Sequence, residues 1–124
     1  MKIKMLPLLL LGVHSAAFAN VGYEVQVIVQ EQKSELIFPA FEIKIPDQEG
    51  TTYAGGCSYV GKLAVQDESN ILLEAKMSCT HDDVESNLEM PTFVLSSKGD
   101  SASYELIDND NVMWKYSVEV KELR

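Results

Sequence analysis

The sequence predicts an all-β protein, folded as a small antiparallel β-sandwich with one disulfide. Apolar and polar residues alternate along many short segments, which is the period of half-buried strands. Clusters of Gly, Pro, Asn, Asp and Ser separate these segments at intervals of about ten residues. No convincing amphipathic helix follows residue 19. An immunoglobulin-like topology and a small barrel would bury the same alternating faces, so both stay open as alternatives.

Residues 1–19 have the composition of a secretory signal peptide, which leaves residues 20–124 as a single all-β domain. Two lysines precede an apolar run, and an Ala-Phe-Ala cleavage sequence ends at Ala19. The apolar run is shorter than the roughly 20 residues that span a bilayer. No cysteine follows the cleavage point, so a lipid anchor is not expected. The sequence therefore predicts a periplasmic or secreted product that is not inserted in a membrane after cleavage.

The two cysteines, Cys57 and Cys79, are expected to form one disulfide, because an exported chain meets an oxidising compartment. Closing a loop of this length contributes about 3 kcal/mol in the chain-entropy model. The spacing is not the Cys-x-x-Cys of redox sites, so a structural role is predicted.

The strands before His81 follow from apolar alternation. Pro39 cannot donate to a ladder and marks an edge, bend or bulge. Gly55 and Gly56 lie within a predicted strand and are interpreted as a bulge or a close backbone approach beside Cys57. Residues 71–79 show the cleanest alternation and place Cys79 on the core face. The predicted strands cover residues 23–29, 36–45, 51–59, 62–66 and 71–79, with turns at 31–34, 46–50 and 67–70.

The last third of the chain begins with its longest polar stretch, residues 80–89, which we expect to be a surface loop. Tyr104, Trp114 and Tyr116 lie on the apolar faces of later strands, so core packing is predicted for all three rather than a ligand surface. Further strands are predicted at 93–95, 102–106 and 112–120, with turns at 96–100 and 108–111.

The chain has a formal net charge of −9, and removal of the signal peptide with its two lysines makes the remainder more acidic. Nucleic acids and anionic membrane surfaces are polyanions that bind through Lys and Arg, so neither is an expected partner. A basic protein partner in the cell envelope is compatible with this charge, and so is a cationic ligand.

His81 is the one histidine of residues 20–124, and Asp82 and Asp83 adjoin it. Histidine and carboxylates can perform acid–base chemistry. However, no G-x-S-x-G sequence occurs, and bridged cysteines offer no nucleophile. We therefore expect a solvated histidine, no enzyme activity and no cofactor.

Asp108 and Asp110 are weak candidates for calcium ligands, because calcium prefers carboxylate and amide oxygens. The glycine and distal glutamate of an EF-hand are missing. A plain hairpin turn is the favoured interpretation, so no metal site is predicted.

The functional hypothesis is a non-enzymatic protein-binding module, such as an inhibitor, an immunity-type protein or an accessory protein of an envelope complex. Acidic groups would contact the partner. The alternative is a structural or assembly subunit that acts by strand-edge pairing, although Pro39 and Pro91 are typical of edges protected against pairing. The candidate contact residues are His81, Asp82, Asp83, Glu85 and Glu89.

Overall fold

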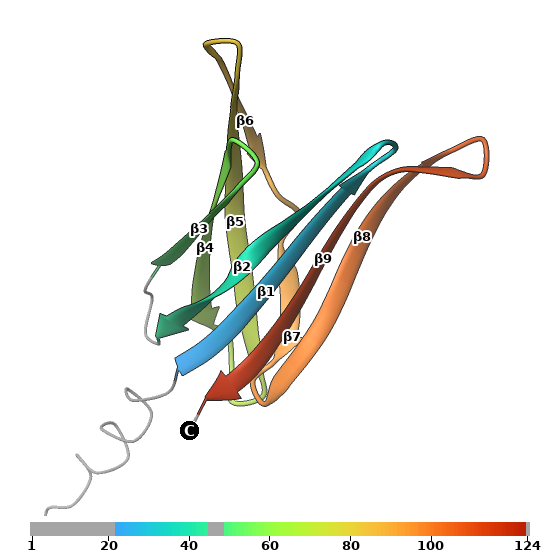
Figure 1. Cartoon of the computed structure of the whole chain (residues 1–124). Coiled ribbons are helices and arrows are strands. Elements are labelled where there is room, and N and C mark those ends of the chain that lie inside the picture. The colour runs from blue at the N-terminus through green and yellow to red at the C-terminus, as the bar shows by residue number, and fades with distance from the viewer. Residues whose placement is uncertain (1–21, 45–48, 124) are drawn as a thin grey trace, which may run out of the picture.

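Two antiparallel β-sheets pack face to face in the computed structural model, which describes residues 22–44 and 49–123 (Figure 1). The predicted all-β sandwich with one disulfide is thereby confirmed. The predicted signal peptide, residues 1–19, and most of the predicted turn at 46–50 lie outside the described residues. Within the described ranges, no helix is long and apolar enough to cross a membrane.

The four-stranded sheet has the order β2-β1-β9-β8, and the five-stranded sheet has the order β3-β4-β5-β6, with β7 also paired to β5. β6 and β7 follow one another along the same edge of β5, because β6 pairs with residues 76–81 and β7 with residues 70–73. The strands are β1 Gly22–Glu31, β2 Ser34–Lys44, β3 Glu49–Ala54, β4 Cys57–Val65, β5 Asn70–His81, β6 Val84–Glu89, β7 Phe93–Ser96, β8 Gly99–Asp108 and β9 Asn111–Leu123.

Three hairpins turn through two residues with positive φ, the geometry that matches the right-handed twist of the flanking strands. Gly55 and Gly56 form the β3–β4 turn, so the bulge predicted there was wrong: two glycines in succession allow the chain to reverse. Residues 80–89 are also not a loop. They complete the β5–β6 hairpin, because aspartate tolerates the left-handed conformation at the turn between the strands.

Pro39 lies on β2, an edge strand, where the register against β1 shifts. Val25 is opposite Phe41 and Val27 is opposite Phe38, so β2 carries an extra residue there. The Gln26 side-chain amide donates to the Phe38 carbonyl at 2.7 Å beside this bulge. The edge and bulge predicted from Pro39 are therefore confirmed.

The core lies between the sheets and is formed by alternate residues of their strands. Tyr59 on β4 and Tyr116 on β9 come from different sheets and share a hydroxyl–hydroxyl hydrogen bond of 2.5 Å. Their rings are 6.1 Å apart, which ties the two layers together at the centre. The buried apolar residues are Tyr23, Val25, Val27, Val29, Phe38, Ile43, Cys57, Tyr59, Leu63, Ile71, Leu73, Met77, Met90, Leu95, Tyr116, Val118 and Val120.

The disulfide joins Cys57 on β4 to Cys79 on β5, at directly opposite positions of neighbouring strands with Cα atoms 4.0 Å apart. It therefore crosslinks one sheet, whereas the disulfide of an antibody domain joins two. Cys79 packs against the core, as its place in the alternating segment predicts.

Candidate functional site: the open end of the sandwich

Four hairpins have two-residue turns, namely β1–β2, β3–β4, β5–β6 and β8–β9, and their tips lie at one end of the molecule, opposite the C-terminus (Figure 1). At this end the two sheets diverge, and the β5–β6 and β8–β9 hairpins project furthest. We call this region the open end. It consists of residues 77–88 of the β5–β6 hairpin and residues 104–114 of the β8–β9 hairpin.

Inner-face side chains are left uncovered on β8. Tyr104 is directly opposite Tyr116, and Leu106 is directly opposite Trp114, so both belong to the face that carries the core. Tyr104 is nevertheless 43% exposed and Leu106 50% exposed. The core position predicted for Tyr104 was therefore wrong, because its hairpin extends beyond the cover of the other sheet. Tyr116 is fully buried, as predicted, and Trp114 is partly buried against the core.

β6 carries a matching pair of uncovered inner-face residues. Leu88 is opposite the buried Met77, and Val84 lies four residues earlier on the same face. Leu88 is 45% exposed and Val84 is 67% exposed. Both sheets therefore present apolar inner-face side chains to solvent at the open end. Patches of this kind on soluble proteins are typical of interaction sites.

A chain of aromatic contacts connects this surface to the centre of the core. The ring of Tyr104 packs edge-on against Trp114 at 6.3 Å, and Trp114 lies 6.1 Å from Tyr116. Tyr116 in turn contacts Tyr59 and Phe93. Edge-to-face and tilted geometries are the favourable ones for aromatic pairs, so Tyr104 packs against Trp114, which in turn packs against the core.

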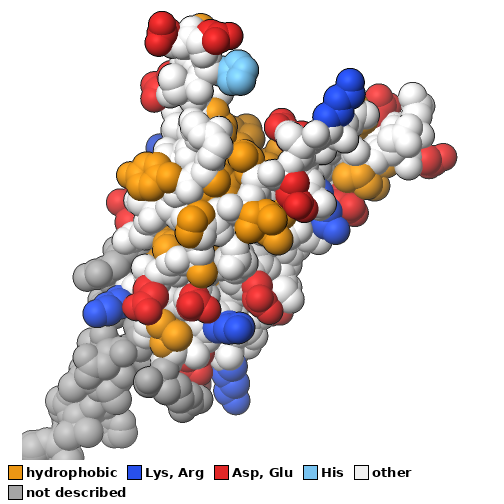
Figure 2. All heavy atoms as spheres, in the orientation of Figure 1, with side chains coloured by type: hydrophobic (Ala, Val, Ile, Leu, Met, Phe, Trp, Pro, Cys, Tyr) orange, Lys and Arg blue, Asp and Glu red, His pale blue; other side chains and the backbone are white. Residues whose placement is uncertain are grey.

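The open end is also strongly acidic (Figure 2). Asp82 and Asp83 form the tip of the β5–β6 hairpin, next to the exposed His81 that ends β5. Figure 2 shows acidic side chains at the tips of both projecting hairpins, and hydrophobic side chains at the surface below them. Asp108 and Asp110 lie at the β8–β9 tip. This end therefore combines apolar surface with carboxylates.

The structure brings together four of the five predicted contact residues, His81, Asp82, Asp83 and Glu85, on the β5–β6 hairpin. The fifth, Glu89, lies at the other end of β6, opposite Lys76.

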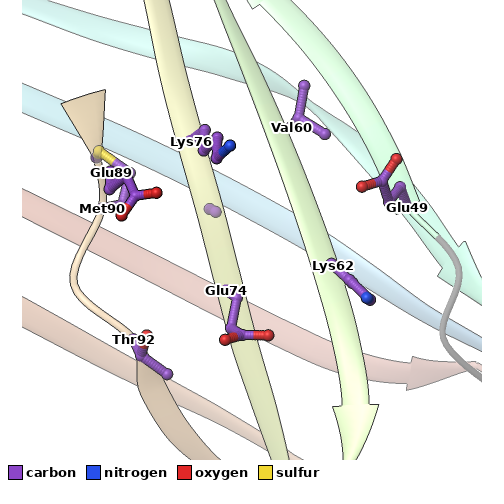
Figure 3. Close-up of a pocket in the computed structure, with 9 residues that line it drawn as sticks. Glu49, Val60, Lys62, Glu74, Lys76, Glu89, Met90 and Thr92 are labelled. Carbon is purple, nitrogen blue, oxygen red and sulfur yellow. The ribbon is translucent and has the colours of Figure 1, made fainter. Parts of the chain in front are cut away.

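Glu89 lines a shallow groove of about 310 Å³ on the outer face of the five-stranded sheet (Figure 3). Acidic and basic residues alternate across this groove. Glu49 is opposite Lys62, and Lys62 is opposite Glu74. Opposite charges at facing positions stabilise a sheet and offset one another. The groove therefore offers a ligand little net charge, and we interpret it as part of the sheet surface.

The hairpin turn predicted at 108–111 is confirmed, since β8 ends at Asp108, β9 begins at Asn111, and Asn109 and Asp110 have positive φ. Throughout the described part of the chain, no group of three or more His, Cys, Asp or Glu residues is placed to hold a metal ion.

A feature that the sequence analysis missed is the bare edge of the five-stranded sheet. All six residues of β6 are exposed, and in the described structure the strand is paired on one side, with β5. Alternation was visible in the sequence, with Val84, Ser86 and Leu88 on one face. The strand was not predicted because the two successive aspartates were not recognised as a hairpin turn.

The arrangement of these groups suits binding. Aromatic and aliphatic side chains, exposed carboxylates and an unpaired strand edge are all features through which proteins hold other polypeptides. Comparison of the chain with protein-family models, with curated proteins and with solved structures finds no match.

Proposed function

We propose that this chain is an exported, non-enzymatic module that binds a partner protein at its open end. The observation that carries the proposal is the exposure of Tyr104 and Leu106 on the inner face of β8. Side chains on a core-bearing face normally contribute to stability by being buried, and here both are exposed to water, with Tyr104 packed against Trp114. An aromatic anchor held in this way is typical of a binding hot spot.

The charge of the open end supports a basic partner. Asp82, Asp83, Asp108 and Asp110 lie at the two projecting tips, and their field attracts cationic surfaces over a Debye length of about 8 Å at physiological salt. Added salt is expected to slow association more than it speeds dissociation, because the acidic groups flank the apolar surface.

Export is supported by the signal-like residues 1–19 and by the Cys57–Cys79 disulfide. An inhibitor, an immunity-type protein or an accessory protein of an envelope complex would each use such a module in the periplasm or outside the cell. All three require a stable scaffold and a recognition surface, and none requires catalytic groups.

The test compares a double variant, Tyr104→Ser with Leu106→Ser, with a matched control, Ile37→Ser with Val94→Ser. The control removes two comparably exposed apolar side chains from outer faces of the sheets. Proteins captured from an envelope extract are quantified for each form. We expect at least one protein to be captured by the wild type and the control and lost with the open-end variant. Equal capture by all three forms would contradict the proposal.

The alternative role, a self-assembling structural subunit, is favoured by one observation, the bare edge of β6. Antiparallel pairing of two β6 strands about Asn87 would place Glu85 of each copy opposite Glu89 of the other. Like charges at facing positions destabilise a sheet. Light scattering over a range of concentrations separates the roles, since a subunit that paired with itself would grow in mass.

A further inference from the structure

The free edge of β6 presents backbone hydrogen-bonding groups in a defined register. In a two-residue hairpin the residues that flank the turn, His81 and Val84, form the first hydrogen-bonded pair. Alternate residues then direct their N–H and C=O groups toward β5. The Met90 N–H donates to the Ala75 carbonyl at 2.9 Å, as this alternation of inward-directed and outward-directed residues predicts. The backbone groups of the intervening residues therefore point away from the sheet. These are Glu85, Asn87 and Glu89.

Two of the other sheet edges, β2 and β3, lie beside one another. β2 and β3 pack together, and the Thr52 hydroxyl donates to the Pro39 carbonyl at 2.7 Å. β7 has four residues and contacts part of the ten-residue β8, whose residues 103–108 are exposed. Of the strands that the structure describes, β6 combines a free edge with exposure of every residue. A further strand therefore has room to pair there.

The side chains of β6 define the chemistry of a strand that would add to it. Glu85 and Glu89 share the outer face with Asn87, whose side-chain carbonyl accepts a hydrogen bond from the Ser78 hydroxyl at 2.6 Å. Val84 and Leu88 lie on the inner face, toward the apolar surface of the open end. A pairing strand places its alternate side chains beside these two sets.

We propose that β6 accepts an extended segment of the partner in which basic residues alternate with apolar residues. The basic side chains lie beside Glu85, which is opposite Thr80, and beside Glu89, whose charge is partly offset by Lys76. The apolar side chains lie beside Val84 and Leu88. The backbone of the segment pairs with the N–H and C=O groups of Glu85, Asn87 and Glu89. This inference rests on the proposed function and specifies how the open end holds its partner. It also explains why a bare edge bears two glutamates, since they repel a second copy and attract a basic strand.

The decisive variants are Asn87→Pro and Asn87→Ala. Both remove the side-chain amide, but only proline removes the outward N–H and constrains the edge. Both variants lose the hydrogen bond from the Ser78 hydroxyl. Because the Asn87 N–H is not directed at β5, proline at this position spares the backbone hydrogen bonds of the β5–β6 hairpin. Amide hydrogen exchange in β5 verifies that the hairpin is retained.

The probe is a synthetic peptide of about seven residues, the length of an ordinary strand, in which lysine and valine alternate. Two control peptides have the same composition in separate blocks, or glutamate in place of lysine. We expect the alternating lysine peptide to shift the amide resonances of β6 and to protect those of Glu85, Asn87 and Glu89 from exchange. We expect Asn87→Pro to weaken its binding by about tenfold relative to Asn87→Ala.

Equal binding of the peptide by Asn87→Pro and Asn87→Ala would overturn strand addition, and so would equal binding of the alternating and block peptides. If Asn87→Pro does not fold, the test uses Glu85→Lys, which leaves the backbone intact. This variant is expected to bind the glutamate peptide more tightly than the lysine peptide, the reverse of the wild-type preference. The proposed function has its own test. It is contradicted if the double variant Tyr104→Ser with Leu106→Ser still captures the natural partner. Loss of the partner in that variant together with failure of the peptide tests would leave the function standing and refute this mode of binding.

Discussion

Tyr59 and Tyr116 meet between the two sheets, and each buried hydroxyl has the other as its hydrogen-bond partner. Replacing either one with phenylalanine leaves a single hydroxyl in the core without that partner, which costs about 1–3 kcal/mol. Replacing both removes the need for the bond. We therefore expect Tyr59→Phe with Tyr116→Phe to be more stable than the sum of the single changes predicts. Urea unfolding of the four forms measures this coupling, and additive losses would contradict it.

The same pair predicts a loss of stability at alkaline pH. Burial raises the pKa of Tyr59, and it raises that of Tyr116 from 10.0 to about 12. A group whose pKa is higher in the folded state contributes stability that is complete below its unfolded pKa and declines as pH rises toward its folded pKa. The free energy of unfolding should therefore fall between about pH 10 and pH 12. Unfolding titrations at several pH values test this, with Tyr59→Phe, Tyr116→Phe as the control that should fall less steeply.

The strands and their faces could largely be predicted from the sequence, because period-two alternation is a local property of the chain. Residues 71–79 show this best, since the predicted inner face is the observed one. The turns were harder. Gly55 and Gly56 are compatible with a bulge or with a reversal of the chain direction. Which of the two forms depends on whether Cys57 pairs with Cys79 on a neighbouring strand, and that pairing is a long-range contact.

The open end could be predicted only in part. Tyr104 has the pattern of a core residue, and local alternation carries no information on how far the opposite sheet extends. Asp82, Asp83 and Glu85 were predicted to contact a partner, but the sequence analysis did not place Asp82 and Asp83 at a hairpin tip. The free edge of β6 follows from strand order, which depends on long-range pairing and leaves no local signal.

Asp67 organises the β4–β5 connection at the end of the molecule opposite the proposed site. Its carboxylate accepts hydrogen bonds from the backbone N–H groups of Ser69 at 2.8 Å and Asn70 at 2.9 Å. The Ser69 bond is the main cause that lowers the pKa of Asp67 below 3.8. A lowered pKa contributes stability that is present above the unfolded pKa and is lost as pH falls through the folded one.

We therefore expect Asp67→Ala to lower the melting temperature at neutral pH and to have little effect in strong acid, where the carboxyl is protonated in both states. Glu68→Ala is the matched control, since it removes the same charge from the same exposed connection. Thermal melts of the two variants at both pH values make the comparison. Equal melting temperatures of the two variants at neutral pH would show that loss of the charge alone, and not loss of the hydrogen bonds to the turn, causes the change in stability.

The Cys57–Cys79 disulfide lies next to β6, the strand with the proposed binding edge, because Cys79 is opposite Ser86 of β6. It fastens β5 to β4, and β5 is the strand that supports β6. A crosslink with a sequence separation of 22 restricts the unfolded chain, so Cys57→Ser with Cys79→Ser should lower the free energy of unfolding by about 3 kcal/mol. Binding of the alternating lysine–valine peptide should then weaken only as far as the folded fraction falls, since the contacts of β6 are unchanged. Calorimetric titration at a temperature where the variant is folded separates the two effects: full affinity there indicates a scaffold role, and an unaltered free energy of unfolding would refute it.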